Sequence, residues 1–252
     1  MSQYNPLSAL LDKQDFLLLD GALATELEAR GCHLVDSLWS AKILLENPEL
    51  IREVHLDYFR AGAQCAITAS YQATPAGFAA CGFDEAQAKA LIGKSVELAR
   101  KAREAYLAEN PQAGTLLVAG SVGPYGAFLA DGSEYRGDYT LSGEDYQTFH
   151  RPRVEALLDA GVDLLACETL PNFAEIQALA ALLTAYPRAR AWYSFTLRDS
   201  EHLSDGTPLR EVVTFLEHYP QTVAVGINCI ALQQATAALQ HLHGITALPL
   251  VV

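Results

Sequence analysis

Short apolar runs alternate along the chain with longer segments whose apolar residues recur at helical spacing. The apolar runs are nearly continuous, as in strands that are covered on both faces of a sheet. They predict strands at residues 16–20, 65–70, 115–123, 163–169, 189–196, 223–229 and 247–252. The segments between them predict helices at residues 47–62, 85–108, 143–160, 173–186, 209–218 and 231–242. This alternation is typical of parallel βαβ units in an α/β protein.

Two of the predicted helices begin with a recognisable signal. Asn47 precedes Pro48, and Thr207 precedes Pro208, which suits a side-chain cap followed by a proline in the first turn. Gly62 is expected to end the first of these helices.

No linker, low-complexity tract or charged run interrupts the alternation, so we expect residues 1–252 to form a single domain. Parallel βαβ units build either an open doubly wound sheet or a closed (β/α)₈ barrel of the TIM type. Polar residues collect at the carboxyl ends of many predicted strands, and a barrel gathers those ends around one mouth. The sequence also has neither glycine-rich nucleotide fingerprint. The barrel is therefore the favoured architecture.

The predicted barrel is C-terminally incomplete, because the chain ends in its seventh strand at Val252. An arc of seven strands leaves apolar edges at its first and last strands, which invite self-association. We expect either that the native chain continues past Val252 or that the folding of this product is compromised.

Composition narrows the class of ligand. The 17 basic and 30 acidic side chains give a formal net charge of −13. This charge argues against a nucleic-acid partner and suits cationic or zwitterionic small molecules, with simple solubility as the alternative explanation. The sequence shows neither a secretory signal nor an apolar stretch that could span a membrane. Five widely spaced cysteines without a Cys-x-x-Cys pair favour reduced thiols, so we expect a cytoplasmic protein.

Polar groups at the ends of the first two predicted strands are candidates for substrate contacts. Asp20 and Gly21 end the first strand, where glycine allows a ligand to approach the backbone closely. Thr68 and Tyr71 lie in the segment ITASYQAT, which ends the second strand. An ordinary hydrogen-bonded turn is an equally open interpretation of each segment.

The next two strand ends add an aromatic ring and a carboxylate. Gly123 and Tyr125 lie in the loop GSVGPYGAFL, which has no lysine for phosphate but carries rings that could face an onium group. A plain turn is the alternative. Glu168 ends the fourth strand in CETLP, where a carboxylate beside an apolar run needs a partner such as a substrate ammonium. By strand alternation, Cys167 then points the other way and packs.

Cys229 follows Asn228 at the end of the strand VAVGINC, where a thiol could pack, attack a substrate or bind a metal. Cys65 begins its predicted strand, at the opposite end of a barrel. His202 is the nearest candidate for a catalytic histidine, and a weak one. On the residues alone, a buried packing cysteine is the simplest interpretation.

The motifs Asp20-Gly21, ITASYQAT, GSVGPYGA, CETLP and GINC occur in the order and at the spacing of one family. From about residue 15 to its last residue, the chain resembles the homocysteine S-methyltransferases, which include betaine–homocysteine methyltransferase. It is most similar to the bacterial enzymes that use S-methylmethionine. The resemblance implies a (β/α)₈ barrel that transfers a methyl group from a sulfonium donor, S-methylmethionine or S-adenosylmethionine, to the thiol of L-homocysteine, giving methionine.

The resemblance also implies roles for individual residues. Asp20 and Gly21 would bind the amino acid, and Glu168 would recognise its amine. Cys229 would be a zinc ligand and thereby take part in catalysis. The pocket around the substrates would further include Thr68, Tyr71, Gly123, Tyr125 and Asn228.

Zinc would explain why this chemistry uses a thiolate ligand. A free thiol, with a pKa of about 8.5, is mostly protonated at neutral pH, whereas a thiol that enters the open position of a catalytic zinc is deprotonated. The family's other two zinc ligands are adjacent cysteines in a Gly-Gly-Cys-Cys segment after the eighth strand, and this sequence lacks that segment. We therefore expect weak or no zinc binding, and doubtful methyl transfer, from the chain as it stands.

Two other hypotheses stay open. The chain could be a non-catalytic barrel that binds an amino acid or self-associates through its open edges. It could also be a zinc-independent barrel enzyme that uses Glu168 as an acid or base. All three hypotheses involve small molecules rather than nucleic acid or membrane, and the preferred donor and the oligomeric state stay undecided.

Overall fold

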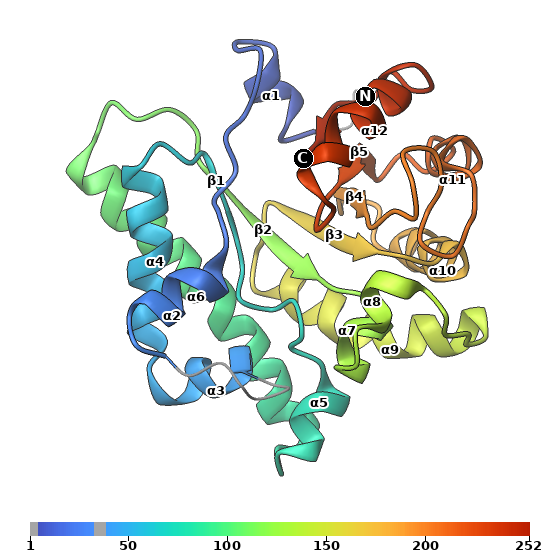
Figure 1. Ribbon diagram of the computed structural model, residues 1–252. Coiled ribbons are helices and arrows are strands. Elements are labelled where there is room, and N and C mark those ends of the chain that lie inside the picture. The colour runs from blue at the N-terminus through green and yellow to red at the C-terminus, as the bar shows by residue number, and fades with distance from the viewer. Residues whose placement is uncertain (1–4, 33–38) are drawn as a thin grey trace. The chain divides into compact units, whose positions relative to one another are not determined.

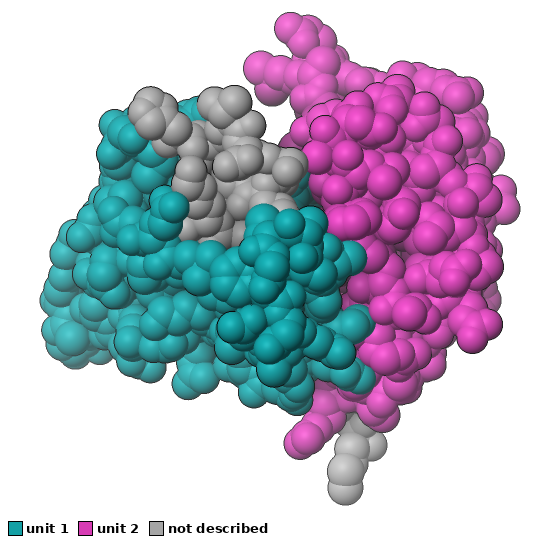
Figure 2. All heavy atoms as spheres, turned by 90° about the horizontal axis from the view of Figure 1, so that it is seen from below, with its two compact units in different colours: residues 1–121, 152–164 teal, residues 122–151, 165–252 magenta. Residues whose placement is uncertain are grey.

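The computed structural model describes residues 5–32 and 39–252. They form two compact units, coloured separately in Figure 2. The first unit contains residues 1–121 and 152–164, and the second contains residues 122–151 and 165–252. The prediction of a single domain stays a prediction.

The first unit contains two neighbouring parallel strands, which pair with Cys65 opposite Leu117 (Figure 1). The strands are β1 (Cys65–Ile67) and β2 (Leu117–Val122). The helices before β2 are α1 (Ser8–Leu11), α2 (Leu23–Ala29), α3 (Trp39–Glu46), α4 (Pro48–Arg60), α5 (Pro75–Ala80) and α6 (Glu85–Glu109). The helix α9 (Gly143–Asp159) crosses from the second unit into the first at Pro152.

Helices α4 and α6 lie side by side in the first unit (Figure 1). Asp84 starts α6 with a capping box, in which its carboxylate accepts the Gln87 N–H while the Gln87 side chain accepts the Asp84 N–H. α4 begins at Pro48 as predicted, but the Asn47 side chain makes no capping hydrogen bond, so that part of the prediction is wrong. Gly62, at φ +106°, follows the end of α4.

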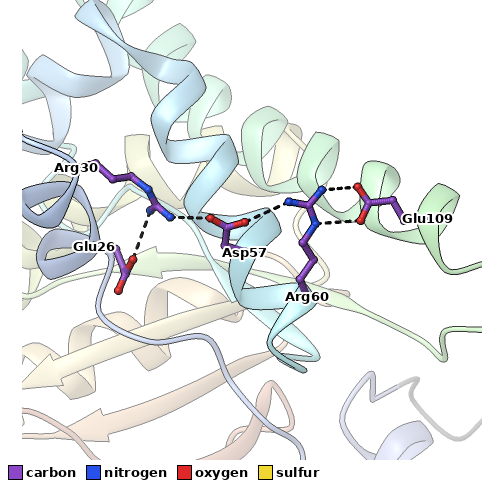
Figure 3. Close-up of polar contacts among 5 residues, drawn as sticks. All are labelled: Glu26, Arg30, Asp57, Arg60 and Glu109. Atoms are coloured by element: carbon purple, nitrogen blue, oxygen red, sulfur yellow. Dashed lines mark hydrogen bonds and ion pairs between the residues drawn. The ribbon is translucent and has the colours of Figure 1, made fainter.

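A chain of ion pairs runs across α2, α4 and α6 (Figure 3). Arg30 lies between Glu26 and Asp57, with N–O distances of 3.5 and 2.7 Å. Arg60 joins Asp57 at 3.3 Å to Glu109, where two of its nitrogens donate at 2.5 and 3.0 Å. Apart from the half-buried Arg30, these side chains are well exposed to water and salt, so the pairs contribute little compared with the apolar contacts beneath them.

The predicted strand at residues 16–20 is wrong in extent. Only Leu19 forms a bridge, parallel to Cys65, and the Asp20 N–H donates to the Cys65 carbonyl at 2.9 Å. Phe16 and Leu18 are exposed. Because this segment pairs with β1 alone among the described residues, its ladder stops after one bridge.

The second unit contains four parallel strands whose order in the sheet is their order in the chain. They are β3 (Leu164–Leu170), β4 (Ala191–Phe195), β5 (Thr222–Ile227) and β6 (Leu250–Val251). The helices of this unit, apart from α9, are α7 (Tyr125–Leu129), α8 (Ser133–Arg136), α10 (Phe173–Leu183), α11 (Leu209–Leu216) and α12 (Leu232–His243).

Every residue of β4 and β5 is buried, as expected for strands that are covered on both faces. α10 is capped by Asn172, whose side chain accepts the Glu175 N–H at 3.3 Å. α11 follows Pro208 rather than a Thr207 cap, because Thr207 belongs to a turn in which its N–H donates to Asp205. The prediction of a Thr207 cap is wrong.

The prediction of an α/β fold built from parallel strands and intervening helices is confirmed. The described residues contain six strands instead of seven, because the segment at residues 16–20 forms only a bridge. Among the described helices, none combines the length and apolar character that a bilayer crossing requires.

Gly226 is a glycine that strand pairing requires. It lies opposite Val251, and an added Cβ would overlap the Val251 backbone. We expect Gly226→Ala to separate β6 from β5 and to lower the free energy of unfolding by about 1–3 kcal/mol, measured by urea denaturation.

Gly93→Ala is the matched control. A Cβ at Gly93 meets only the Ala160 Cβ, at 3.9 Å, within the long helix α6. This variant should gain roughly 0.5–1 kcal/mol through helix propensity. If both substitutions changed stability in the same direction, the close approach of β6 to Gly226 would not be the cause.

Candidate functional site

Asp20 ties the segment before α2 to β1 in the first unit. Its side chain is 5% exposed, and its Oδ2 accepts the Ile67 N–H at 2.8 Å. The same oxygen lies 3.7 Å from Nδ1 of His55, a buried side chain of α4. Neither ring nitrogen of His55 has a hydrogen-bond partner among the described residues. The Asp20 carboxylate therefore has a structural task at β1, and its contact with a substrate stays a prediction.

Gly21 has a packing reason to be glycine. An added Cβ would lie 2.7 Å from the hydroxyl oxygen of Tyr58 and 2.9 Å from its ring. Tyr58 donates its hydroxyl to the Ala22 carbonyl at 3.3 Å. Burial, followed by the nearby charges of Glu26 and Asp20, raises the pKa of Tyr58. In this structure the close approach at Gly21 is made by Tyr58.

Thr68 and Tyr71 are held by hydrogen bonds at the end of β1. The buried Thr68 hydroxyl shares a 2.8 Å hydrogen bond with Ser70 and accepts the Ser121 N–H at 3.0 Å. Ser70 in turn donates to the Ser121 carbonyl. The Tyr71 carbonyl accepts from the buried Arg153 at 2.7 Å. These contacts fix the loop backbone and leave the Tyr71 ring half-buried.

In the second unit, the Asn228 amide bridges the ends of two strands. Its Oδ1 accepts the Thr169 N–H at 2.9 Å, and its Nδ2 donates to the Thr169 hydroxyl at 2.8 Å and to Cys229 Sγ at 3.7 Å. Thr169 and Cys229 both have left-handed backbones, with φ of +62° and +52°. A left-handed β-branched residue is strained, so the Asn228 amide holds the backbone beside Glu168 in a costly conformation.

The Cys229 side chain is exposed, and the Glu168 side chain is half-buried. Partial burial of the sulfur, followed by the negative charges of Glu168 and Glu134, raises the pKa of Cys229, while the Thr169 hydroxyl opposes this shift. The free thiol is therefore protonated at neutral pH. Cys229 is well placed for a ligand from solvent, unlike the buried Cys65 and Cys167.

No group of three or more His, Cys, Asp or Glu side chains that could hold a metal ion occurs in residues 5–32 and 39–252. A catalytic zinc takes three protein ligands and a structural zinc takes four. Cys229 supplies a single thiol. The donors described here do not fit a complete zinc site.

Tyr125 starts α7, two residues after the buried Gly123, and lies in an aromatic cluster. Its ring centroid is 5.0 Å from Phe149, 5.6 Å from Phe128 and 5.7 Å from Tyr139. The half-buried Tyr125 ring therefore has neighbours on several sides. The loop is more than a plain turn.

Glu175 is a residue that the sequence did not single out. It lies in the first turn of α10, is fully buried, and accepts the Tyr125 N–H and the Tyr139 hydroxyl, both at 2.5 Å. Its Oε1 also lies 2.7 Å from His150 Nε2. Burial and the charge of Glu175 raise the pKa of Tyr139. Acidic residues are common in the first turn of a helix, so nothing in the sequence indicated that Glu175 is buried.

The Asn228–Thr169 contact generates a stability prediction. Asn228→Ala removes both hydrogen bonds that hold Thr169, and we expect a loss of about 2 kcal/mol in the free energy of unfolding. In a Thr169→Gly background, the same change should cost roughly half as much, because glycine lacks the hydroxyl that accepts one of the two hydrogen bonds and adopts a positive φ without strain. Urea denaturation of the four proteins measures this coupling. Equal costs in both backgrounds would contradict it.

Comparison with known proteins identifies the family of this chain. Residues 17–252 match the family model for homocysteine S-methyltransferase. Homocysteine S-methyltransferase of Escherichia coli (strain K12) is 86% identical over 252 residues, which span 100% of this chain and 81% of that protein. Homocysteine S-methyltransferase YbgG of Bacillus subtilis (strain 168) is 51% identical, over 98% of this chain and 80% of YbgG.

A solved structure gives the same result. The crystal structure of the metallated form of the homocysteine methyltransferase MmuM from Escherichia coli has a TM-score of 0.97 and 86% sequence identity. The match covers 98% of this chain and 86% of that chain. On these similarities, the chain belongs to the homocysteine S-methyltransferase family.

Proposed function

We propose that this chain transfers a methyl group from a sulfonium donor, S-methylmethionine or S-adenosylmethionine, to the thiol of L-homocysteine. The observation that carries the proposal is the 86% identity, over the whole chain, to the Escherichia coli homocysteine S-methyltransferase. In this reaction the homocysteine sulfur forms a bond to the methyl carbon as the carbon–sulfonium bond breaks. The electron pair of that bond returns to the donor sulfur, which becomes a thioether, and the homocysteine thiol proton is released.

Glu168 is the proposed recognition group for the homocysteine ammonium. Its half-buried side chain lies at the carboxyl end of β3, next to the strained Thr169. A carboxylate in such a place gains from a charged hydrogen-bond donor. We assign to Asn228 a positioning role rather than a substrate contact, because its amide is already engaged by Thr169 and Cys229.

The first unit supplies further proposed contacts for the amino acid. Asp20 and Gly21 present the backbone that follows the Leu19–Cys65 bridge, and Thr68 and Tyr71 belong to the hydrogen-bonded loop after β1. In the second unit, Gly123 and Tyr125 carry the proposed donor side, where an aromatic ring attracts the positive sulfur by cation–π interaction. The net charge of −13 also favours a cationic donor.

Cys229 is the proposed metal ligand, with zinc as the expected metal of the family. A thiolate suits this borderline-soft ion, and Cys229 is open to solvent. The described residues do not complete a zinc site around Cys229.

Three broader predictions belong to the same proposal. The parallel strand order and the similarity to MmuM support an incomplete (β/α)₈ barrel of the TIM type in residues 1–252. The five free cysteines support a cytoplasmic location. Exposed apolar side chains at Phe16 and Leu18 support self-association as the alternative role for this chain.

Glu168→Gln tests the proposed ammonium contact. The variant should raise the KM for homocysteine roughly tenfold, since a hydrogen bond to a charged group is lost, and should leave the KM for S-methylmethionine unchanged. Methionine formation is the assay. With 4-mercaptobutanoate, which is homocysteine without its amine, wild type and variant should react equally.

Glu201→Gln is the control, because Glu201 is an exposed glutamate in the same unit. It should behave as wild type. If Glu168→Gln slowed both acceptors equally, Glu168 would not recognise the ammonium. A wild-type chain that binds homocysteine but forms no methionine from either sulfonium would favour a non-catalytic binding protein.

Zinc content provides a separate test. We expect the wild-type chain, after dialysis against a chelator, to retain well below one Zn²⁺ per chain, because Cys229 lacks companion ligands among the described residues. Elemental analysis measures the content, and Cys229→Ser should lower whatever zinc is retained. One firmly held zinc in wild type, unchanged by Cys229→Ser, would show that the metal is bound elsewhere.

A further inference from the structure

Glu175 joins three segments of the second unit that lie far apart in the sequence. One carboxylate receives the backbone N–H of Tyr125 at the start of α7 and the hydroxyl of Tyr139 in the loop before α9. His150 of α9 lies against the same group at 2.7 Å. A fully buried carboxyl group is stable only when hydrogen bonds replace its lost water. Glu175 meets that condition, because hydrogen bonds with Tyr125, Tyr139 and His150 replace its lost water.

Asn172 fixes the helix turn that carries Glu175. The Asn172 Oδ1 accepts the Glu175 N–H at 3.3 Å, and its Nδ2 donates to the carbonyls of Tyr139 and Gly137 at 2.9 and 3.3 Å. Two residues separate the end of β3 from the start of α10, and β3 carries Glu168. Glu175 is therefore anchored to the strand that bears the proposed ammonium contact.

The network places Tyr125 through its backbone and its ring together. The Tyr125 N–H is bound to Glu175, while its ring meets Tyr139, itself bound to Glu175, at a centroid distance of 5.7 Å. Phe149 lies 5.0 Å from the Tyr125 ring and 4.9 Å from the His150 ring. Tyr139 contacts the Tyr125 ring and is hydrogen-bonded to Glu175. Phe149 contacts the Tyr125 ring and packs on His150, which also contacts Glu175.

We propose that Glu175 is a positioning residue for the methyl donor, which holds the Tyr125 ring and its loop at a fixed place relative to the end of β3. The proposal rests on the proposed function, since it assigns Tyr125 to the sulfonium side. Alignment of donor and acceptor is a large part of the rate advantage in such a displacement, so a loosened Tyr125 weakens donor binding first.

The test compares two substitutions of the same side chain. In Glu175→Gln, the amide oxygen still accepts from Tyr125 and His150, while the amide N–H₂ donates to the Tyr139 hydroxyl oxygen. Glu175→Leu fills the space but offers no acceptor. Val213→Ala is the control for general destabilisation, because Val213 is a buried residue of α11 that none of the described hydrogen bonds of the network involves.

Three measurements separate positioning from mere stability. Hydrogen exchange reports the Tyr125 amide, calorimetry reports binding of S-methylmethionine and of homocysteine, and methionine formation gives both KM values. Glu175→Leu should speed exchange of the Tyr125 amide and weaken S-methylmethionine binding by about tenfold, the loss expected for hydrogen bonds to a charged group, with homocysteine binding unchanged. Glu175→Gln should restore both values to within roughly threefold of wild type.

Two results would overturn the proposal while the proposed function stands. One is unchanged exchange at Tyr125 in Glu175→Leu. The other is an equal loss of donor and acceptor binding, as a general destabilisation like that of Val213→Ala would produce. A wild-type chain that binds neither S-methylmethionine nor S-adenosylmethionine would instead remove the proposed function, and the role of Glu175 with it.

Discussion

Strands that are buried on both faces have mostly apolar side chains, and the candidate polar residues therefore lie mainly at the strand ends. All side chains of β4 and β5 are buried. Polar groups therefore gather where a strand stops, and there each must satisfy unpaired backbone as well as any ligand. Asp20 binds the Ile67 N–H, Thr68 binds the Ser121 N–H, and Asn228 binds the Thr169 N–H. These three side chains are candidates for substrate contacts, and in this protein they also stabilise the fold.

The repeating pattern of the sequence predicted most strands and the helices α4, α6, α9, α10, α11 and α12. It missed the shorter helices of the described residues, which are α1, α2, α3, α5, α7 and α8. The helix predicted at residues 85–108 and the strand predicted at residues 163–169 agree with the bounds of α6 and β3 to within one residue. Their apolar residues recur at the spacing of the positions that the fold buries. The strand at residues 16–20 was overestimated for the opposite reason. Its composition suits a covered strand, but a strand needs neighbours, and the described partner of this segment is β1 alone. Sequence composition does not carry that information.

The assignment of the candidate site residues to substrate or metal stays a prediction, and the structure gives several of them structural tasks that the sequence did not indicate. Gly21 was expected to admit a ligand, yet the Tyr58 ring occupies the space that a side chain would need. Asn228 was expected at the substrate, yet its amide is engaged in holding Thr169 at positive φ. Glu175 gave no signal, because a glutamate in the first turn of a helix is ordinary until the fold buries it. Such tasks depend on contacts between residues that lie tens of positions apart.

The strained backbone and the buried carboxylate have a common consequence for catalysis by this fold. Thr169 at φ +62° is costly, and so is a carboxyl group without water at Glu175. Both costs are offset by hydrogen bonds from residues beside the proposed substrate groups, so displacing a ligand-binding segment would also expose an unsatisfied group. Displacing Glu168, Cys229 or Tyr125 would therefore raise the free energy of the protein, and this cost holds the three residues in place. Rigid placement of this kind is what an in-line methyl transfer needs, because the reacting atoms gain most from geometry that exists before the substrates arrive.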